Sequence, residues 1–104
     1  MWIFLNDAFF SIVRPAQGSR LLVRARKAGD INKHFPKAKV TFTPNADYHY
    51  RALISEKEVS AKIKTNIEKI DYSNFKDSVP ENGRHNAYLG VWTAMHHYQY
   101  TKGR

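Results

Sequence analysis

The sequence DYSNFKDSVPENGRHNAYLGVW, residues 71–92, is the stretch around which we expect the fold to be organised. It begins where one predicted helix ends, continues as a polar connection and enters the most aromatic helix of the chain. Phe75 and Val79 are apolar residues in this connection, and such residues commonly pin a loop to a core. We therefore expect the rest of the chain to converge on this segment.

A capping box marks the start of the helix before this stretch. Ser55 is followed three residues later by Glu58, so each side chain can bond a free backbone N–H of the first turn. Apolar residues then recur at helical spacing, at Val59, Ile63, Ile67 and Ile70. A second helix is expected to begin near Asn82 or Gly83, with one stripe formed by Tyr88, Val91, Trp92 and Met95.

Shorter elements are predicted upstream of these helices. Apolar and polar residues alternate, or apolar runs stand between turn residues, in the segments 2–5, 9–13, 20–27, 37–43 and 48–54. Gly29 and Asp30 can begin a short helix through Phe35, where Pro36 ends it.

The order of these elements predicts an α+β fold. We expect a mostly antiparallel sheet of about five strands in hairpins, with one short helix between the hairpins and two C-terminal helices packed on one face. A chain of 104 residues can bury one core, so residues 1–104 are expected to form a single domain. The last residues, 101–104, are expected to be a loose tail.

The charge is strongly positive and unevenly distributed. The chain has 17 Lys and Arg against 9 Asp and Glu, a formal net charge of +8. Residues 1–43 contain eight of the basic and two of the acidic side chains, so the positive field belongs mainly to the first half. Such a field favours polyanionic partners, either nucleic acid or an acidic protein or nucleoprotein surface. The alternative is that the charge serves solubility alone.

Several classes of chemistry are not indicated. The chain has no cysteine, which excludes disulfides, thiolate metal sites and a cysteine nucleophile. No phosphate-loop, dinucleotide or metal-ligand motif is present, so we expect no cofactor and no metal, and we assign no catalytic residue. The apolar start is broken by Asn6 and Asp7 and has no basic residue before it, so neither a signal peptide nor a membrane span is expected. We expect a cytoplasmic protein without membrane association.

The main candidate site is a basic sheet face. Period-two alternation places Arg20, Arg24 and Arg26 on one side of the strand over 20–27, and Lys39 can join them from the next hairpin. The strand over 48–54 adds aromatic and basic residues, namely Tyr48, Tyr50 and Arg51. Arginines beside aromatic rings suit phosphate contacts and base stacking. The alternative is a solvated outer face, because antiparallel sheets often leave one face wet.

Histidines offer a second candidate chemistry. A ribonuclease without metal needs a base and an acid near an arginine, and His49, Arg51 and either His85 or His96 could supply them. Nothing in their spacing requires that they meet. His96 and His97 point about 100° apart on a helix, so at most one of them can face a given site. The alternative is that the histidines are structural or simply exposed.

Several segments also carry a resemblance to known proteins. These are MWIF at 1–4, FFSIV at 9–13, LVRAR at 22–26, Asp47-Tyr48 with Arg51, DYSNFK at 71–76, and Tyr88 with Val91-Trp92. Over nearly its full length the chain resembles a group of small, uncharacterised bacterial and phage-type proteins. The resemblance implies a stand-alone domain of about this length and brings no activity or functional residue with it.

Three functions are consistent with these observations. The leading hypothesis is a small non-enzymatic binding protein whose basic sheet face engages nucleic acid or a nucleoprotein complex. One alternative is a phage or mobile-element inhibitor of a host defence nuclease, of the anti-CRISPR type, which would bind an acidic protein patch. The other alternative is a metal-independent ribonuclease that uses His49, Arg51 and His85.

Overall fold

The computed structural model describes residues 1–101, which group into two compact units, Met1–Asp71 and a second unit that begins at Tyr72. The predicted α+β class is confirmed, because residues 1–101 contain five strands and three α-helices. A single domain over 1–104 stays a prediction, and of the expected tail only Thr101 lies within the described residues.

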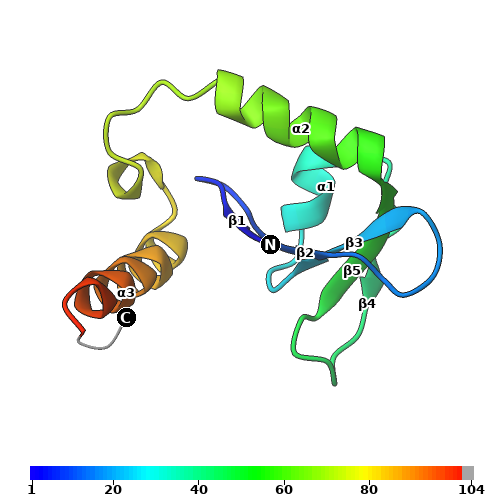
Figure 1. The fold of residues 1–104 in the computed structure, drawn as a ribbon, viewed down its shortest axis with the longest axis horizontal. Coiled ribbons are helices and arrows are strands. Elements are labelled where there is room, and N and C mark those ends of the chain that lie inside the picture. The colour runs from blue at the N-terminus through cyan, green and yellow to red at the C-terminus, as the bar shows by residue number, and fades with distance from the viewer. Residues whose placement is uncertain (102–104) are drawn as a thin grey trace. The chain divides into compact units, whose positions relative to one another are not determined.

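The first unit is built on one antiparallel sheet with the strand order β1-β2-β3-β5-β4 (Figure 1). Its strands are β1 (Trp2–Phe4), β2 (Phe9–Val13), β3 (Arg20–Ala25), β4 (Thr41–Phe42) and β5 (Tyr50–Ser55). β3 and β5 form the centre and pair over six residues each. The sheet therefore joins a three-stranded meander to a hairpin, as the sequence predicts.

Helices α1 (Asp30–His34) and α2 (Glu56–Glu68) lie on the same face of this sheet (Figure 1). The predicted cap of α2 is confirmed, because Ser55 Oγ accepts a hydrogen bond from the backbone N–H of Glu58 at 3.2 Å. Gly29, which precedes α1, has φ of 87°, a left-handed conformation that glycine adopts without steric cost. Both helix starts thus follow from the residues that stand at them.

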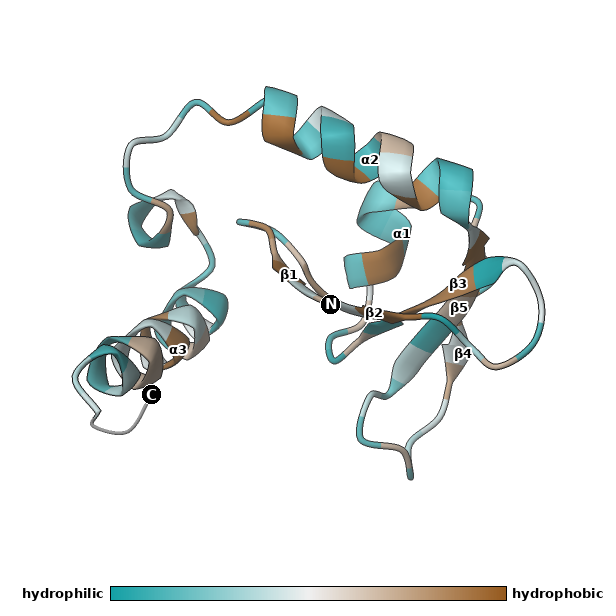
Figure 2. Ribbon diagram, in the orientation of Figure 1, coloured by the Kyte–Doolittle hydropathy of each residue, from teal (hydrophilic) through white to brown (hydrophobic). Residues whose placement is uncertain are grey.

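The hydrophobic core lies between the two helices and the sheet. Figure 2 shows hydrophobic residues concentrated along the strands and recurring along α2. Alternate strand residues, Phe10, Ile12, Val23, Ala25, Ala52 and Ile54, pack there with Ile31, Phe35 and Val59 from the helical segments. Burying one large apolar side chain contributes about 1.5–3 kcal/mol, so this face holds most of the unit's stability.

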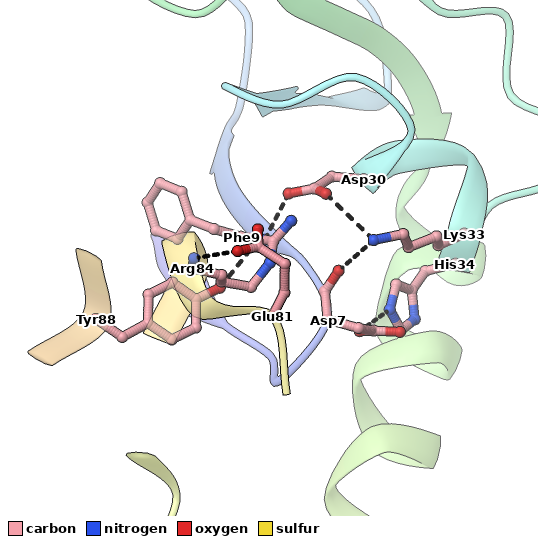
Figure 3. Close-up of polar contacts among 8 residues, drawn as sticks. All are labelled: Asp7, Phe9, Asp30, Lys33, His34, Glu81, Arg84 and Tyr88. Carbon is pink, nitrogen blue, oxygen red and sulfur yellow. Dashed lines mark hydrogen bonds and ion pairs between the residues drawn. The ribbon is translucent and has the colours of Figure 1, made fainter. Parts of the chain in front are cut away.

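A buried carboxylate ties the β1–β2 turn to α1. Asp30 is 1% exposed, and its Oδ2 accepts a hydrogen bond from the backbone N–H of Phe9 at 3.0 Å. In Figure 3, Lys33 reaches both the Asp30 carboxylate, at 3.7 Å, and the backbone oxygen of Asp7, at 2.8 Å. His34 Nε2 lies 2.8 Å from Asp7 Oδ1. These contacts fix the turn that orients β1.

The fourth strand is much shorter than expected. The alternation at 37–43 predicts a strand over the whole segment, but β4 covers only Thr41 and Phe42. The first residues of this segment are bonded to α1 instead, because Asn32 Nδ2 donates to the backbone oxygens of Phe35 and Ala38, each at 3.1 Å. The backbone N–H of Ala38 also donates to the oxygen of Phe35. These bonds hold the chain in a turn after the helix.

The second unit contains the short 3-10 helix η1 (Lys76–Ser78) and the long helix α3 (Asn82–Gln99). Val79 is 4% exposed and the ring of Phe75 stacks on Tyr88 at 5.7 Å, whereas the docking of these two residues onto the core stays a prediction. The Glu81 side chain caps α3 by accepting from the backbone N–H of Arg84 at 2.9 Å (Figure 3). Local packing inside this unit therefore agrees with the sequence.

The role expected for residues 71–92 needs a correction. The main core cluster draws its buried residues from Ala8 to Val59, so the fold of the first unit is organised around its sheet. Within the second unit, Phe75 of this stretch stacks on Tyr88. Of the two C-terminal helices, α2 packs on the sheet, and the packing of α3 against it stays a prediction.

Candidate nucleic-acid interface

The strand register shows which side chains share the face opposite α1 and α2. Directly paired residues of an antiparallel sheet point to the same side. Trp2 pairs with Ser11, Ser11 with Arg24, Arg24 with Arg51, and Arg51 with Thr41. This row crosses all five strands, and we call the side of the sheet that it occupies the arginine face; within the row Ser11 is buried and Trp2 is exposed. Phe9 on β2, Leu22 on β3 and Leu53 on β5 point to the same side, since each lies two residues from a member of the row.

Three arginines of this face contact Tyr48, two through its ring and one through its backbone oxygen. The guanidinium carbons of Arg24 and Arg26 lie 4.6 and 4.1 Å from the ring centroid of Tyr48. Arg24 also donates to Ser11 Oγ at 2.7 Å. Arg51 is the cross-strand partner of Arg24, and its Nε donates to the backbone oxygen of Tyr48 at 3.5 Å. The tyrosine thus serves as a common support for the guanidinium groups.

One carboxylate accompanies these three cations. Arg51 lies 3.6 Å from Asp47 Oδ1, and that oxygen also accepts from the backbone N–H of Tyr48. Arg26 contacts the backbone oxygen of Asp47, at 2.9 Å, and makes no ion pair with a carboxylate in the described part of the chain. The cluster therefore has an excess of positive charge and guanidinium groups that are positioned without a full set of counterions.

A second basic group lies at the other end of the same strand. Arg20, Lys37 and Lys39 line a pocket of about 290 Å³ together with Leu53 and Glu58. Arg20 and Arg24 are four residues apart on β3, which corresponds to roughly 13 Å. The structure therefore separates Arg20 and Lys39 from the arginine cluster and places the Leu22–Leu53 pair between them.

The two tyrosines do not take the stacking role predicted for them. Tyr48 is 4% exposed, so its ring is occupied by arginines and does not receive a base. Tyr50 pairs with Ala25 and points to the core face, where its ring lies 5.3 Å from that of Phe42. The alternation of the strand over 48–54 does not extend to Tyr48, because β5 begins at Tyr50.

Sequence reasoning missed an aromatic residue on the arginine face. Trp2 is 67% exposed and belongs to the same cross-strand row as Arg24. Its ring packs edge-on against Phe9 at 6.3 Å, and Phe9 packs on Phe4 at 4.6 Å. The alternation of Trp2 and Phe4 with Ile3 indicates that Trp2 and Phe4 share one side of the strand. Which side of the sheet that is depends on the β1–β2 register.

The histidines considered for catalysis are distributed over both units. His49 is exposed beside Phe42, at 5.9 Å between rings. His85 and His96 belong to the second unit, where His96 stacks on Trp92 at 4.9 Å. The ribonuclease grouping of His49, Arg51 and His85 therefore stays a prediction.

Within residues 1–101, no group of three or more metal-ligating side chains of the His, Cys, Asp or Glu type is present. None of the helices in that range has the length and apolar character needed to cross a membrane. No family model, curated protein or solved structure matches this chain. The resemblance to small bacterial and phage-type proteins stays a prediction.

Proposed function

We propose that this protein binds nucleic acid through the arginine face and has no catalytic role in doing so. The observation that carries the proposal is the group formed by Arg24, Arg26 and Arg51, which all contact Tyr48 and of which Arg51 pairs with the carboxylate of Asp47. Guanidinium groups contact phosphate oxygens in a bidentate manner, and the release of counterions makes such binding favourable and salt-dependent.

The supports of these arginines favour binding over mere solubility. A free arginine side chain loses up to about 2 kcal/mol of rotamer entropy when it is fixed in a complex. Arg24 is already held by Ser11 and by the Tyr48 ring, so part of this cost is met in folding. Residues that serve only solubility need no such positioning.

The second basic group lengthens the surface. Arg20, Lys37 and Lys39 lie along the sheet from the cluster, and roughly 13 Å separates Arg20 from Arg24. A linear polyanion can contact both groups, whereas a small anion can contact one. This arrangement favours an extended nucleic acid as the partner over a single phosphate compound.

Titration of fluorescent DNA and RNA oligonucleotides at several salt concentrations tests the proposal. We expect affinity to fall as salt rises. Arg24→Ala and Arg51→Ala should each reduce the salt slope by about 1 for every phosphate that the variant no longer neutralises. Arg14→Ala is the matched control, since it removes the same charge from an exposed residue that pairs with Glu56.

Absence of salt-sensitive binding to both DNA and RNA would overturn the proposal. An equal reduction of affinity by Arg14→Ala would also contradict it, because net charge rather than the arginine face would then account for binding. In the first case the alternative of an acidic protein partner, such as a host defence nuclease, becomes the better explanation of the same surface.

A further inference from the structure

Building on the proposed function, we infer that the arginine face takes single-stranded nucleic acid and that Trp2 is its base-stacking site. Trp2 is the aromatic residue that the cross-strand row brings to the same side as Arg24 and Arg51. It is 67% exposed, and its ring packs edge-on against the ring of Phe9.

The distance between the Trp2 ring and the arginines suits a short segment of single-stranded nucleic acid. Neighbouring strands lie about 4.8 Å apart, so Trp2 on β1 and Arg24 on β3 are roughly 10 Å apart across the sheet. A base stacked on Trp2 therefore leaves the adjoining backbone within reach of the long Arg24 side chain. Beyond it, Arg51 and Arg26 can contact the next phosphates.

The width of the face argues against a duplex as the preferred ligand. Five strands span about 19 Å, whereas the major groove of B-DNA is about 12 Å wide and admits a helix or a two-stranded ribbon. The sheet face cannot enter that groove and would meet only the outer phosphates of a duplex. In a duplex both faces of each internal base are covered by neighbours, so Trp2 would have no base to stack on.

Stacking on an aromatic ring is sequence-tolerant, because every base has a π-face. The predicted ligand is therefore a single strand of DNA or RNA with little sequence preference. The arginines supply the electrostatic part of the affinity, and Trp2 supplies the part that distinguishes a single strand from a duplex.

The test compares a single-stranded oligonucleotide with the duplex of the same length, using the full chain and its Trp2→Ala and Trp2→Phe variants. We expect tighter binding of the single strand. Trp2→Ala is expected to weaken that binding about 5- to 100-fold with an unchanged salt slope, because every phosphate remains neutralised. Trp2→Phe retains a ring and should keep most of the affinity, and thermal unfolding of each variant verifies that the fold is intact.

A fluorescence measurement gives an independent readout. The chain has two tryptophans, so Trp92→Phe leaves Trp2 as the reporter. Stacking predicts quenching of its emission by a single strand and loss of that quenching when the strand carries abasic sites.

Two different failures can be told apart. Equal affinity for duplex and single strand, with no effect of Trp2→Ala, would overturn this inference and leave the proposed function standing. Absence of salt-sensitive binding to either ligand would overturn both.

Discussion

Leu53 and Ile54 are neighbours on β5, yet Leu53 is 44% exposed and Ile54 is 4% exposed. The first belongs to the arginine face, and the second packs in the core beneath α1 and α2. The same difference extends across the sheet, because one face is apolar and covered while the other holds the cluster of three arginines at Tyr48. The comparison teaches that the two faces are stabilised in different ways. Packing holds the core face, whereas an aromatic ring and backbone oxygens hold the charges of the arginine face.

The largest expected effect comes from introducing a lysine on the core face, and a lysine at the neighbouring position on the arginine face is the comparison. Ile54→Lys removes a buried side chain and introduces a charge without a partner, which is expected to cost more than about 4 kcal/mol and to unfold the first unit. Leu53→Lys should change the free energy of unfolding by less than about 1 kcal/mol, because the new ammonium remains in water. It should also strengthen binding to nucleic acid.

Thermal and urea unfolding followed by circular dichroism measures both effects. Similar destabilisation by Leu53→Lys and Ile54→Lys would show that the two faces are equally buried and would break the comparison.

A smaller effect is expected at Tyr48, which is itself buried and supports two of the arginines with its ring. Tyr48→Leu preserves an apolar side chain but removes the ring beneath Arg24 and Arg26. Cation–π contacts of this kind contribute about 0.5–2 kcal/mol, so affinity for a single-stranded oligonucleotide should fall roughly 2- to 30-fold. Tyr48→Phe keeps the ring and should bind nearly as well as the unmodified protein. Equal binding by the Leu and Phe variants, measured by fluorescence anisotropy, would show that the ring does not position the arginines.

The smallest effect is expected at the start of the helix that covers the core face. Ser55→Ala removes the cap of α2 and is expected to cost about 1 kcal/mol. Ser60→Ala is the matched control, since Ser60 Oγ bonds the backbone oxygen of Glu56 inside the helix and alanine is the better helix former there. Urea unfolding should separate the two variants, and binding should be unchanged in both. Equal stabilities would mean that the cap does not determine where the helix begins.

The sequence predicts those parts of the fold that depend on neighbours in the chain. The capping box of Ser55 and Glu58 lies within four residues, and the alternation over 20–25 assigns Val23 to the core and Arg24 to the other face. The shortening of β4 could not be predicted in this way. It depends on Asn32, whose side chain reaches past Phe35 to the backbone of Ala38.

The candidate site was predictable only in part for a related reason. The alternation brings Arg20, Arg24 and Arg26 to one side, but it does not reveal that Tyr48 lies under two of them. That contact requires β3 to pair with β5 in one particular register, which joins residues more than 20 positions apart. Trp2 was missed for the same reason, since its side is set by its pairing with Ser11.

The outermost strands of the sheet are both short, with three residues in β1 and two in β4. An edge strand carries unpaired N–H and C=O groups that can recruit another chain and begin a fibril. Past β4 the pairing with the chain before β5 continues by one hydrogen bond, from the backbone N–H of Thr43 to the oxygen of His49 at 2.7 Å. Because both edge strands are short, few unpaired backbone groups are available to pair with another molecule. We therefore expect less edge-to-edge aggregation than in a sheet with long, flat edge strands.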